Sequence, residues 1–204
     1  MTMNRKFSRL VALAISAFAG MATIAHSPLA HASDLNDGIP HSQRAVTLVQ
    51  ISRVSETYPC DYDKFTRRWM DLLGRYKHGD AQLGSTDART AIDRIRASQG
   101  EQELMYFGSN DHGALFPLIG EPLRKAMRYY IGNPLIAIEM TRKNQDAALY
   151  APLIVLVYEP APGSVRVEYD LPSSSFGQFH DPDIDRVAAS LEAKLHALIV
   201  KAAN

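Results

Sequence analysis

Apolar residues recur at helical spacing in two well-separated parts of the chain. Asp61 suits the N-cap of a first helix, whose apolar face comprises Phe65, Trp69, Leu72, Leu73 and Tyr76. Asp181 and Pro182 suit the N-cap and first position of a last helix, whose apolar stripe comprises Ile184, Val187, Leu191, Leu195 and Leu198. Because each stripe lies on one side of its helix, we expect both helices to pack on the core, with Trp69 buried.

Shorter apolar stretches between these helices have the patterns of β-strands. The predicted strands are 44–54, 104–107, 127–131, 152–158 and a segment that contains Val165, Val167 and Tyr169. Residues 160–163 should turn the chain between the last two strands, and residues 109–113 should form another turn. Two more helices are predicted, from residue 86 or 87 to Gly100 and over 136–148. The sum is an α+β fold with one domain, a mainly antiparallel sheet of about five strands covered by helices on one face.

The N-terminal segment has the composition of a secretory signal peptide. Residues 1–9 carry three cations and no acid, residues 10–25 are almost wholly apolar or small, and Ala30-His31-Ala32 has small residues where a signal peptidase reads them. An apolar run of this length is short of the ~20 residues that span a bilayer. We therefore predict a signal peptide over 1–32, a flexible leader over 33–43 and a domain over 44–204, in a periplasmic or secreted protein.

The charge of the predicted mature chain excludes two classes of partner. Losing residues 1–32 leaves 19 Lys and Arg (22 less 3) against 22 Asp and Glu, a formal charge of −3. Such a chain has no basic surface for nucleic acid and no polybasic segment for acidic lipid. The longest apolar run that remains, 151–158, is too short to cross a membrane.

Cysteine and histidine usage argues against the common metal and thiol sites. Cys60 is the only cysteine, so no internal disulfide can form. It is an inert side chain of the core, a reactive thiol or one half of an intermolecular disulfide. CxxC, HExxH, GxxxxGK and GxSxG patterns are all absent from the sequence, and we expect neither a metal nor a cofactor. His180 could act with His112 as a metal pair only if the fold brought the two together.

An ordered set of short motifs lies between Asp111 and Pro172. In order, the marks are Asp111-His112, Gly132-Asn133-Pro134, Pro152-Leu153, Tyr158-Glu159, Gly163, Tyr169 and Pro172. This block resembles the family catalogued as domain of unknown function 302. The resemblance implies a small α/β domain that is often a dimer, so it implies a homodimer here, and it implies no established activity.

Two positions depart from that family's pattern. Members often have Gly-Thr shortly after the Gly-Asn-Pro, and this chain has Ala137-Ile138. Members often have an acid two residues before the Pro-Leu, and this chain has Tyr150. If the family uses those groups in a site, this protein has lost or altered that site.

Four residues are candidates for a functional site. Asp111 beside His112 could act as an acid–base pair, although Asp111 could equally cap the segment that follows it. Asn133 and Glu159 could support a ligand, and the Gly132–Pro134 corner is either a ligand-holding turn or a structural reversal.

These candidates leave two hypotheses for function. The first is a non-catalytic module that binds a small molecule or another protein. The alternative is a hydrolase- or isomerase-like enzyme that uses Asp111 and His112. The enzyme hypothesis requires the four candidate residues to surround one pocket.

Overall fold

The computed structural model describes residues 43–77, 79 and 87–204. The chain divides into two compact units, Met1–Val46 and Thr47–Asn204, and every helix and strand reported below belongs to the second unit. The predicted signal peptide lies outside the described residues, as does the predicted leader except for its last residue.

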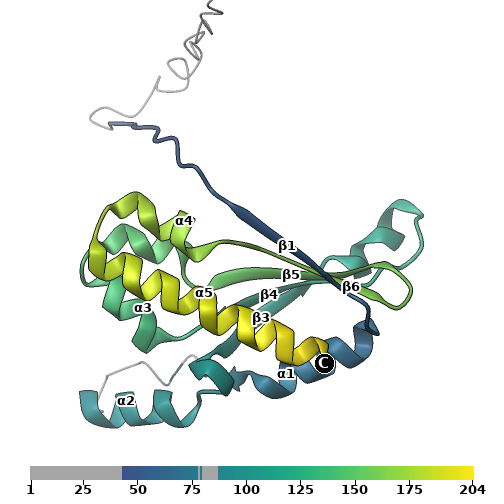
Figure 1. Ribbon diagram of the computed structural model, residues 1–204, viewed down its shortest axis with the longest axis horizontal. Coiled ribbons are helices and arrows are strands. Elements are labelled where there is room, and N and C mark those ends of the chain that lie inside the picture. Colours follow the sequence, from purple (N-terminus) through teal and green to yellow (C-terminus); the bar gives the residue numbers. More distant parts are fainter. Residues whose placement is uncertain (1–42, 78, 80–86) are drawn as a thin grey trace, which may run out of the picture. The chain divides into compact units, whose positions relative to one another are not determined.

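Six strands form one sheet in the order β1-β6-β5-β4-β3-β2 (Figure 1). Neighbouring strands run antiparallel, except that β2 and β3 are parallel. The strands are β1 (Arg53–Tyr58), β2 (Gly74–Arg75), β3 (Met105–Asp111), β4 (Ala126–Gly132), β5 (Leu153–Ala161) and β6 (Ser164–Asp170). The predicted α+β class with a mainly antiparallel sheet is confirmed, with one strand more than expected.

Alternation along β5 and β6 gives the sheet one buried and one open face. Val155 and Val157 are fully buried, whereas Ile154 between Leu153 and Val155 is 46% exposed. Val157 pairs with Val167 of β6, so the buried side chains of the two strands lie on the same side. We call the side that carries Ile154 and Leu156 the open face.

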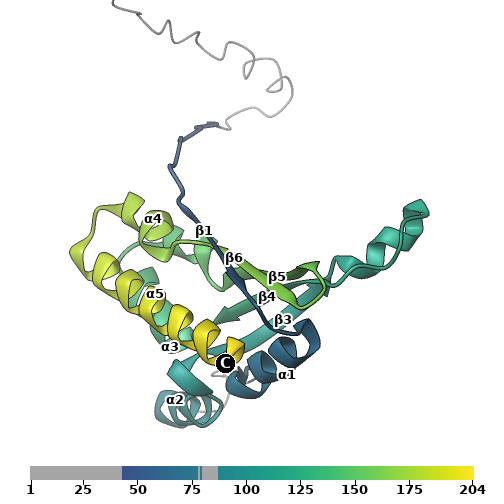
Figure 2. The ribbon, with the colours of Figure 1, turned by 45° about the vertical axis from the view of Figure 1, so that its right-hand side comes forward.

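The helices gather on the buried side of the sheet. They are α1 (Tyr62–Leu72), α2 (Ala88–Ala97), α3 (Pro134–Thr141), α4 (Pro172–Phe176) and α5 (Pro182–Ala203). Short 3-10 segments complete the set: η1 (Glu101–Glu103), η2 (Gly113–Ile119), η3 (Gln145–Tyr150) and η4 (Gly177–Phe179). Figures 1 and 2 show α1 and α5 side by side on the same side of the sheet.

Both predicted core helices are present, but the first is shorter than predicted. Helix α1 ends at Leu72, with Leu73 as its C-cap, and Tyr76 lies beyond it because Gly74 and Arg75 pair with β3 as the short strand β2. Asp61 caps α1, because its side chain accepts a hydrogen bond from the backbone N–H of Lys64, and Trp69 is fully buried. Asp181 caps α5 by accepting from the N–H groups of Asp183 and Ile184. The predicted apolar stripe of α5 is buried along its whole length.

The first strand lies further along the chain than predicted. Residues 43–52 have no regular structure, and β1 starts at Arg53. Its inward positions are Val54, Glu56 and Tyr58, where Glu56 accepts a hydrogen bond from the Tyr58 hydroxyl. Because an acid occupies one inward position, β1 lacks the alternation of apolar and polar residues that predicts a strand. The apolar residues before Arg53 show that alternation better, so the strand was predicted too early in the chain.

Two local predictions in the middle of the chain also need correction. Residues 109–111 are not a turn, since they continue β3 and pair with β4. The predicted helix 136–148 is instead α3 followed by η3, and the break begins after Thr141. Asn144 caps η3 by accepting from the N–H of Asp146, a local bond that starts a new segment rather than continuing the old one.

A projecting segment, residues 112–125, joins β3 to β4 and contains η2. We call it the arm; Figure 2 shows it extending away from the sheet. Of the helices that the structure describes, none is both long enough and apolar enough for a membrane span.

Candidate functional site

In the Gly132-Asn133-Pro134 corner, both polar side-chain atoms of Asn133 are hydrogen-bonded to the backbone. The Asn133 side-chain oxygen accepts from the N–H of Leu135 at 2.8 Å, and its amide nitrogen donates to the carbonyl of Glu103 at 2.8 Å. The residue is 4% exposed and has the extended backbone that a following proline favours. Asn133 is therefore the N-cap of α3 and ties this helix to η1, with Pro134 at the first helical position.

Gly132 is the last residue of β4 and does not have a positive φ. Among the described glycines, a positive φ occurs at Gly120 and Gly163. A Cβ at Gly132 would lie 3.4 Å from the Cβ of Pro152 and 3.6 Å from Cε2 of Phe107, both ordinary contacts. The bare glycine leaves this space open.

A cavity of about 200 Å³ lies at this corner. We call it the corner cavity. Its walls come from β3, β4, α3, β5, α4 and α5, and they comprise Tyr76, Phe107, Gly132, Asn133, Pro134, Ile136, Ala137, Met140, Ala151, Pro152, Leu153, Phe176 and Leu191. Only two of these residues, Tyr76 and Asn133, have polar side-chain atoms, and the side-chain atoms of Asn133 are already bonded.

The walls of the corner cavity are well ordered by packing. Tyr76 and Phe107 stack with ring centroids 4.3 Å apart, and Met140 and Phe176 are almost fully buried. An engineered apolar cavity of about 150 Å³ stays dry and accepts benzene, so this volume suits a molecule of about that size. The cavity can hold an apolar group, and its walls offer no nucleophile.

The two residues that replace the family's usual Gly-Thr lie in different surroundings. Ala137 lines the corner cavity, whereas Ile138 is 56% exposed on the outer side of α3. A glycine at 137 would enlarge the cavity by about a methyl group, so the alanine narrows it.

Asp111, the last residue of β3, and His112 lie beside the opposite end of β4. The Asp111 carboxylate accepts from the N–H of Ala114 at 2.9 Å, so Asp111 caps the arm as the simpler interpretation of the sequence predicted. His112 is exposed, and its backbone N–H donates to the carbonyl of Ala126 at 2.9 Å. Burial raises the pKa of the neighbouring Tyr62 to about 12, and the charge of Asp111 adds to this rise.

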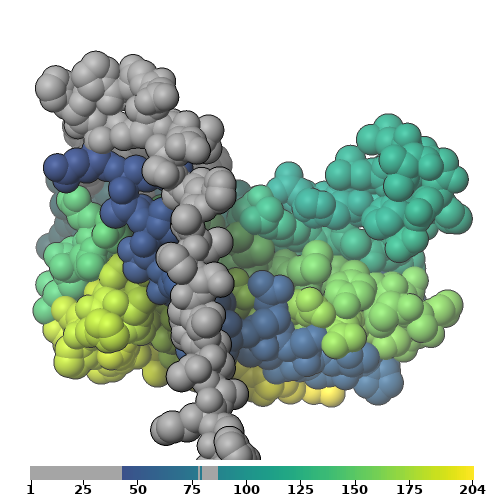
Figure 3. Space-filling view, turned by 90° about the horizontal axis from the view of Figure 1, so that it is seen from above, coloured from purple at the N-terminus to yellow at the C-terminus, as the bar shows by residue number. Residues whose placement is uncertain are grey.

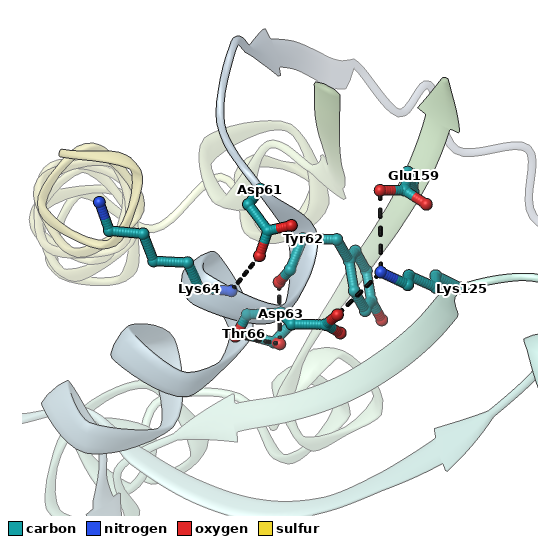
Figure 4. A network of polar contacts seen from close by, with 7 residues as sticks. All are labelled: Asp61, Tyr62, Asp63, Lys64, Thr66, Lys125 and Glu159. Carbon is teal, nitrogen blue, oxygen red and sulfur yellow. Dashed lines mark hydrogen bonds and ion pairs between the residues drawn. The ribbon is translucent and has the colours of Figure 1, made fainter. Parts of the chain in front are cut away.

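Glu159 belongs to a network of ion pairs around Lys125 (Figure 4). The Lys125 ammonium lies 2.8 Å from the Asp63 carboxylate and 3.9 Å from that of Glu159, and it sits 5.5 Å from the ring centre of Tyr62. The hydrogen bond from Lys125 to Asp63 raises the pKa of the ammonium. This network connects the first turn of α1 to β5 and to the residue before β4, so it helps to hold these three elements together.

The four candidate residues do not surround one pocket. Asp111 pairs with Met127 at the start of β4, and Asn133 follows the end of that strand. Six residues of strand separate the two positions by roughly 20 Å. His112 borders a groove on the open face, Asn133 lines the corner cavity, and Glu159 pairs with Lys125. This geometry gives the acid–base alternative no shared site.

The groove beside His112 lies along the open face and has a volume of about 540 Å³. We call it the open-face groove. Ile154 and Leu156 form its apolar floor, and its charged rim includes Arg53, Arg128, Glu168 and Asp170. Arg53 is paired with Asp170, whereas Arg128 stands 5.2 Å from the ring centre of Tyr130 and has no carboxylate partner among the described residues.

Metal and thiol chemistry find no support among the described residues. They contain no cluster of three or more His, Cys, Asp or Glu side chains that could hold a metal ion. His180 ends η4, just before α5, and His112 lies on the far side of the sheet beside the arm. Cys60 is half-buried against the core, and burial raises the pKa of its thiol, which disfavours the reactive thiolate.

Most residues of the corner cavity were not identified from the sequence. Phe107 and Met140 fall in a predicted strand and a predicted helix, and Phe176 falls in no predicted element. Only the fold shows that their side chains leave a space between them. The sequence offered one signal for this site: two of the motifs typical of the family, Gly132–Pro134 and Pro152-Leu153, line the same cavity.

Comparisons with known proteins agree with this fold. Among solved structures, the crystal structure of an uncharacterised conserved DUF302 protein from Bacillus stearothermophilus is similar, with a TM-score of 0.52 at 13% identity over 73% of this chain and 96% of that one. No curated protein matches the sequence. Residues 82–202 match the family described as "Domain of unknown function DUF302". The match covers more than half of the chain, so the protein belongs to the DUF302 family.

Proposed function

We propose that this protein is an exported, non-catalytic module that binds a small apolar molecule in the corner cavity. The observation that carries the proposal is the cavity itself, about 200 Å³ with almost wholly apolar walls that six elements of the fold supply. Ligand sites are typically concave and mostly apolar, with few polar groups. The volume is below the usual range for drug-sized ligands, so the ligand is a single ring or a short aliphatic chain.

Export is proposed from the N-terminal sequence. Residues 1–32 carry the cationic, apolar and small-residue segments of a signal peptide. A periplasmic or secreted location would expose the cavity to small apolar molecules outside the cytoplasm. N-terminal sequencing of the mature protein tests this part, with cleavage before Ser33 as the expected result.

A binding experiment with toluene tests the cavity. The methyl signal of Met140, which lies in the cavity wall, should shift and saturate in NMR spectra as toluene is added. Ala137→Leu should fill the cavity and weaken toluene binding at least tenfold. Ile138→Leu is the matched control, since Ile138 is the next residue of the same helix and is exposed, and it should leave binding unchanged.

Two further results decide between the hypotheses for function. Asp111→Asn and His112→Gln should leave toluene binding unchanged, because these residues lie at the other end of β4. Mass spectrometry of organic molecules retained by the purified protein should find a small apolar compound that Ala137→Leu releases. Absence of a saturable shift at Met140, or the same shift in Ala137→Leu, would refute the proposal.

A further inference from the structure

The charged residues around the open-face groove pair with one another, with one exception. Asp170 pairs with Arg53, and Glu168 pairs with Arg166 at 3.1 Å. Arg128 of β4 borders the same groove and has no carboxylate partner among the described residues. As far as the described chain shows, the groove therefore carries one positive charge that no acid balances.

Neither strand beside β4 places an acid opposite Arg128. The residue opposite it on β3 is Asn110, whose side-chain oxygen accepts a hydrogen bond from the Tyr130 hydroxyl at 2.6 Å, and the residue opposite it on β5 is Leu156. Arg128 is half-buried, and its guanidinium lies 5.2 Å from the ring centre of Tyr130. A guanidinium presents its N–H donors as a planar fork that matches a carboxylate. Arg128 is therefore placed to bind a carboxylate from a second molecule.

The groove beside Arg128 offers an apolar surface as well. Ile154 and Leu156 form its floor, and Phe116 of the arm adds an aromatic ring to its lining. The described helices pack on the other face of the sheet, so they leave this floor uncovered. Its volume of about 540 Å³ falls within the usual range for small-molecule sites, which combine apolar walls with a few polar groups. A ligand suited to the groove therefore has an apolar part and one negative charge.

The base of the arm holds Phe116 in place. Gly113 approaches the returning chain so closely that a Cβ there would lie 1.9 Å from the carbonyl oxygen of Arg124. The Arg124 guanidinium lies over the ring of Phe116 at 4.1 Å and pairs with the carboxylate of Glu121. Beyond this base the arm projects from the rest of the described chain (teal in Figure 3). The aromatic part of the groove is therefore preformed, and the acid of the arm is already paired.

We propose that the open-face groove is a second binding site and takes a small aromatic carboxylate. The carboxylate meets Arg128, and the ring lies on the apolar floor beside Phe116. One unbalanced positive charge matches one carboxylate, whereas a phosphate with two charges would be repelled by the two acids at the rim of the groove. Of the described residues, none lines both the groove and the corner cavity, so this site does not depend on the ligand proposed there.

Titration with phenylacetate tests the proposal on the unmodified protein. The methyl signals of Ile154 should shift and saturate in NMR spectra, while the methyl signal of Met140 in the corner cavity should not move. Phenylacetamide has the same shape without the charge, and acetate has the charge without the ring. Each of these two should bind at least tenfold more weakly. Equal affinity for phenylacetamide or acetate, or a shift at Met140 in place of Ile154, would overturn the proposal.

Substitution of Arg128 identifies the group that meets the carboxylate. Arg128→Met keeps most of the aliphatic stem and removes the charge, so it should weaken phenylacetate binding at least tenfold and leave the weak binding of phenylacetamide unchanged. Arg128→Lys keeps the charge without the planar fork and should fall between the two. Arg67→Met makes the matched change at an exposed arginine of α1 and should have no effect. Phenylacetate binding that Arg128→Met leaves unchanged, or that Arg67→Met weakens equally, would contradict the proposed site.

Discussion

Polar residues that looked equally suited to a site lie beside the two ends of β4, but their surroundings in the fold differ. At the C-terminal end, Asn133 is buried and its side-chain amide is bonded to the backbone on both sides. Beside the N-terminal end, Asp111 is exposed and its carboxylate accepts a hydrogen bond from one backbone N–H. His112 is also exposed. The concave site lies beside the asparagine whose polar atoms are already occupied. The ligand proposed for this cavity would therefore be recognised by shape and apolar contact.

The comparison predicts its largest effect at Asn133. Asn133→Ala removes the cap of α3 and the side-chain partners of two partly buried backbone groups, so it should lower the free energy of unfolding by about 1–3 kcal/mol. Urea denaturation measures the loss. Asn133→Asp, which keeps the accepting oxygen for Leu135 but not the donor to Glu103, should fall between wild type and alanine. A loss below about 0.5 kcal/mol for Asn133→Ala would contradict this view of the corner.

The next effect concerns the buried phenol beside Asp111. The folded-state pKa of Tyr62, about 12, lies above its unfolded value near 10. The folded protein holds this proton more tightly, so the contribution is complete below about pH 10 and is lost as pH rises through 12. Stability should therefore fall across this window in the wild type, and less in Tyr62→Phe.

Denaturation at pH 9 and pH 11 measures this difference. Tyr130→Phe, on the open face, provides a variant with a phenol removed from the other side of the sheet. An equal loss of stability on alkalisation in wild type and Tyr62→Phe would show that Tyr62 does not contribute.

A smaller effect is expected at Asp111. Asp111→Ala removes one exposed capping bond to Ala114, so it should cost about 0.5–1 kcal/mol, well below the change at Asn133. Asp111→Ser can still accept the hydrogen bond and should restore most of the loss. If Asp111→Ala were as damaging as Asn133→Ala, the contrast between the two ends of β4 would be lost.

The smallest effect should come from the Lys125 network. Lys125→Met keeps the aliphatic stem over Tyr62 but removes the ion pairs with Asp63 and Glu159. Because exposed ion pairs contribute little and are screened by salt, the difference from wild type should be small and should shrink further in 1 M NaCl. A large, salt-independent loss would instead indicate that the network is a buried structural element.

The elements that could be predicted are those whose sequence signals all lie within one short segment of the chain. Helix α5 was identified completely because its cap, its N-terminal proline and its apolar stripe all lie within one segment. Strand β1 was misplaced because Glu56 faces inward, where it bonds the Tyr58 hydroxyl and lies 3.2 Å from Nδ1 of His196, 140 residues away. That partner is visible only after folding.

The candidate site was harder to predict for the same reason. The corner cavity joins Tyr76 to Leu191, and its volume is the space that those side chains leave unfilled. The sequence singled out the Gly-Asn-Pro corner, and in the fold the side-chain amide of its Asn133 is hydrogen-bonded to two backbone groups. The sequence analysis made no prediction for the segment 114–119, and the exposure of its apolar side chains follows from the arm's extension away from the sheet.

The close approach of Gly113 to Arg124 has a consequence for how the protein can evolve. The direction of the arm depends on one backbone contact that admits no side chain at position 113. The exposed side chains at 118 and 119, by contrast, meet no such restriction. Among descendants of this chain we therefore expect the glycine at the base of the arm to persist, while the residues farther along the arm vary.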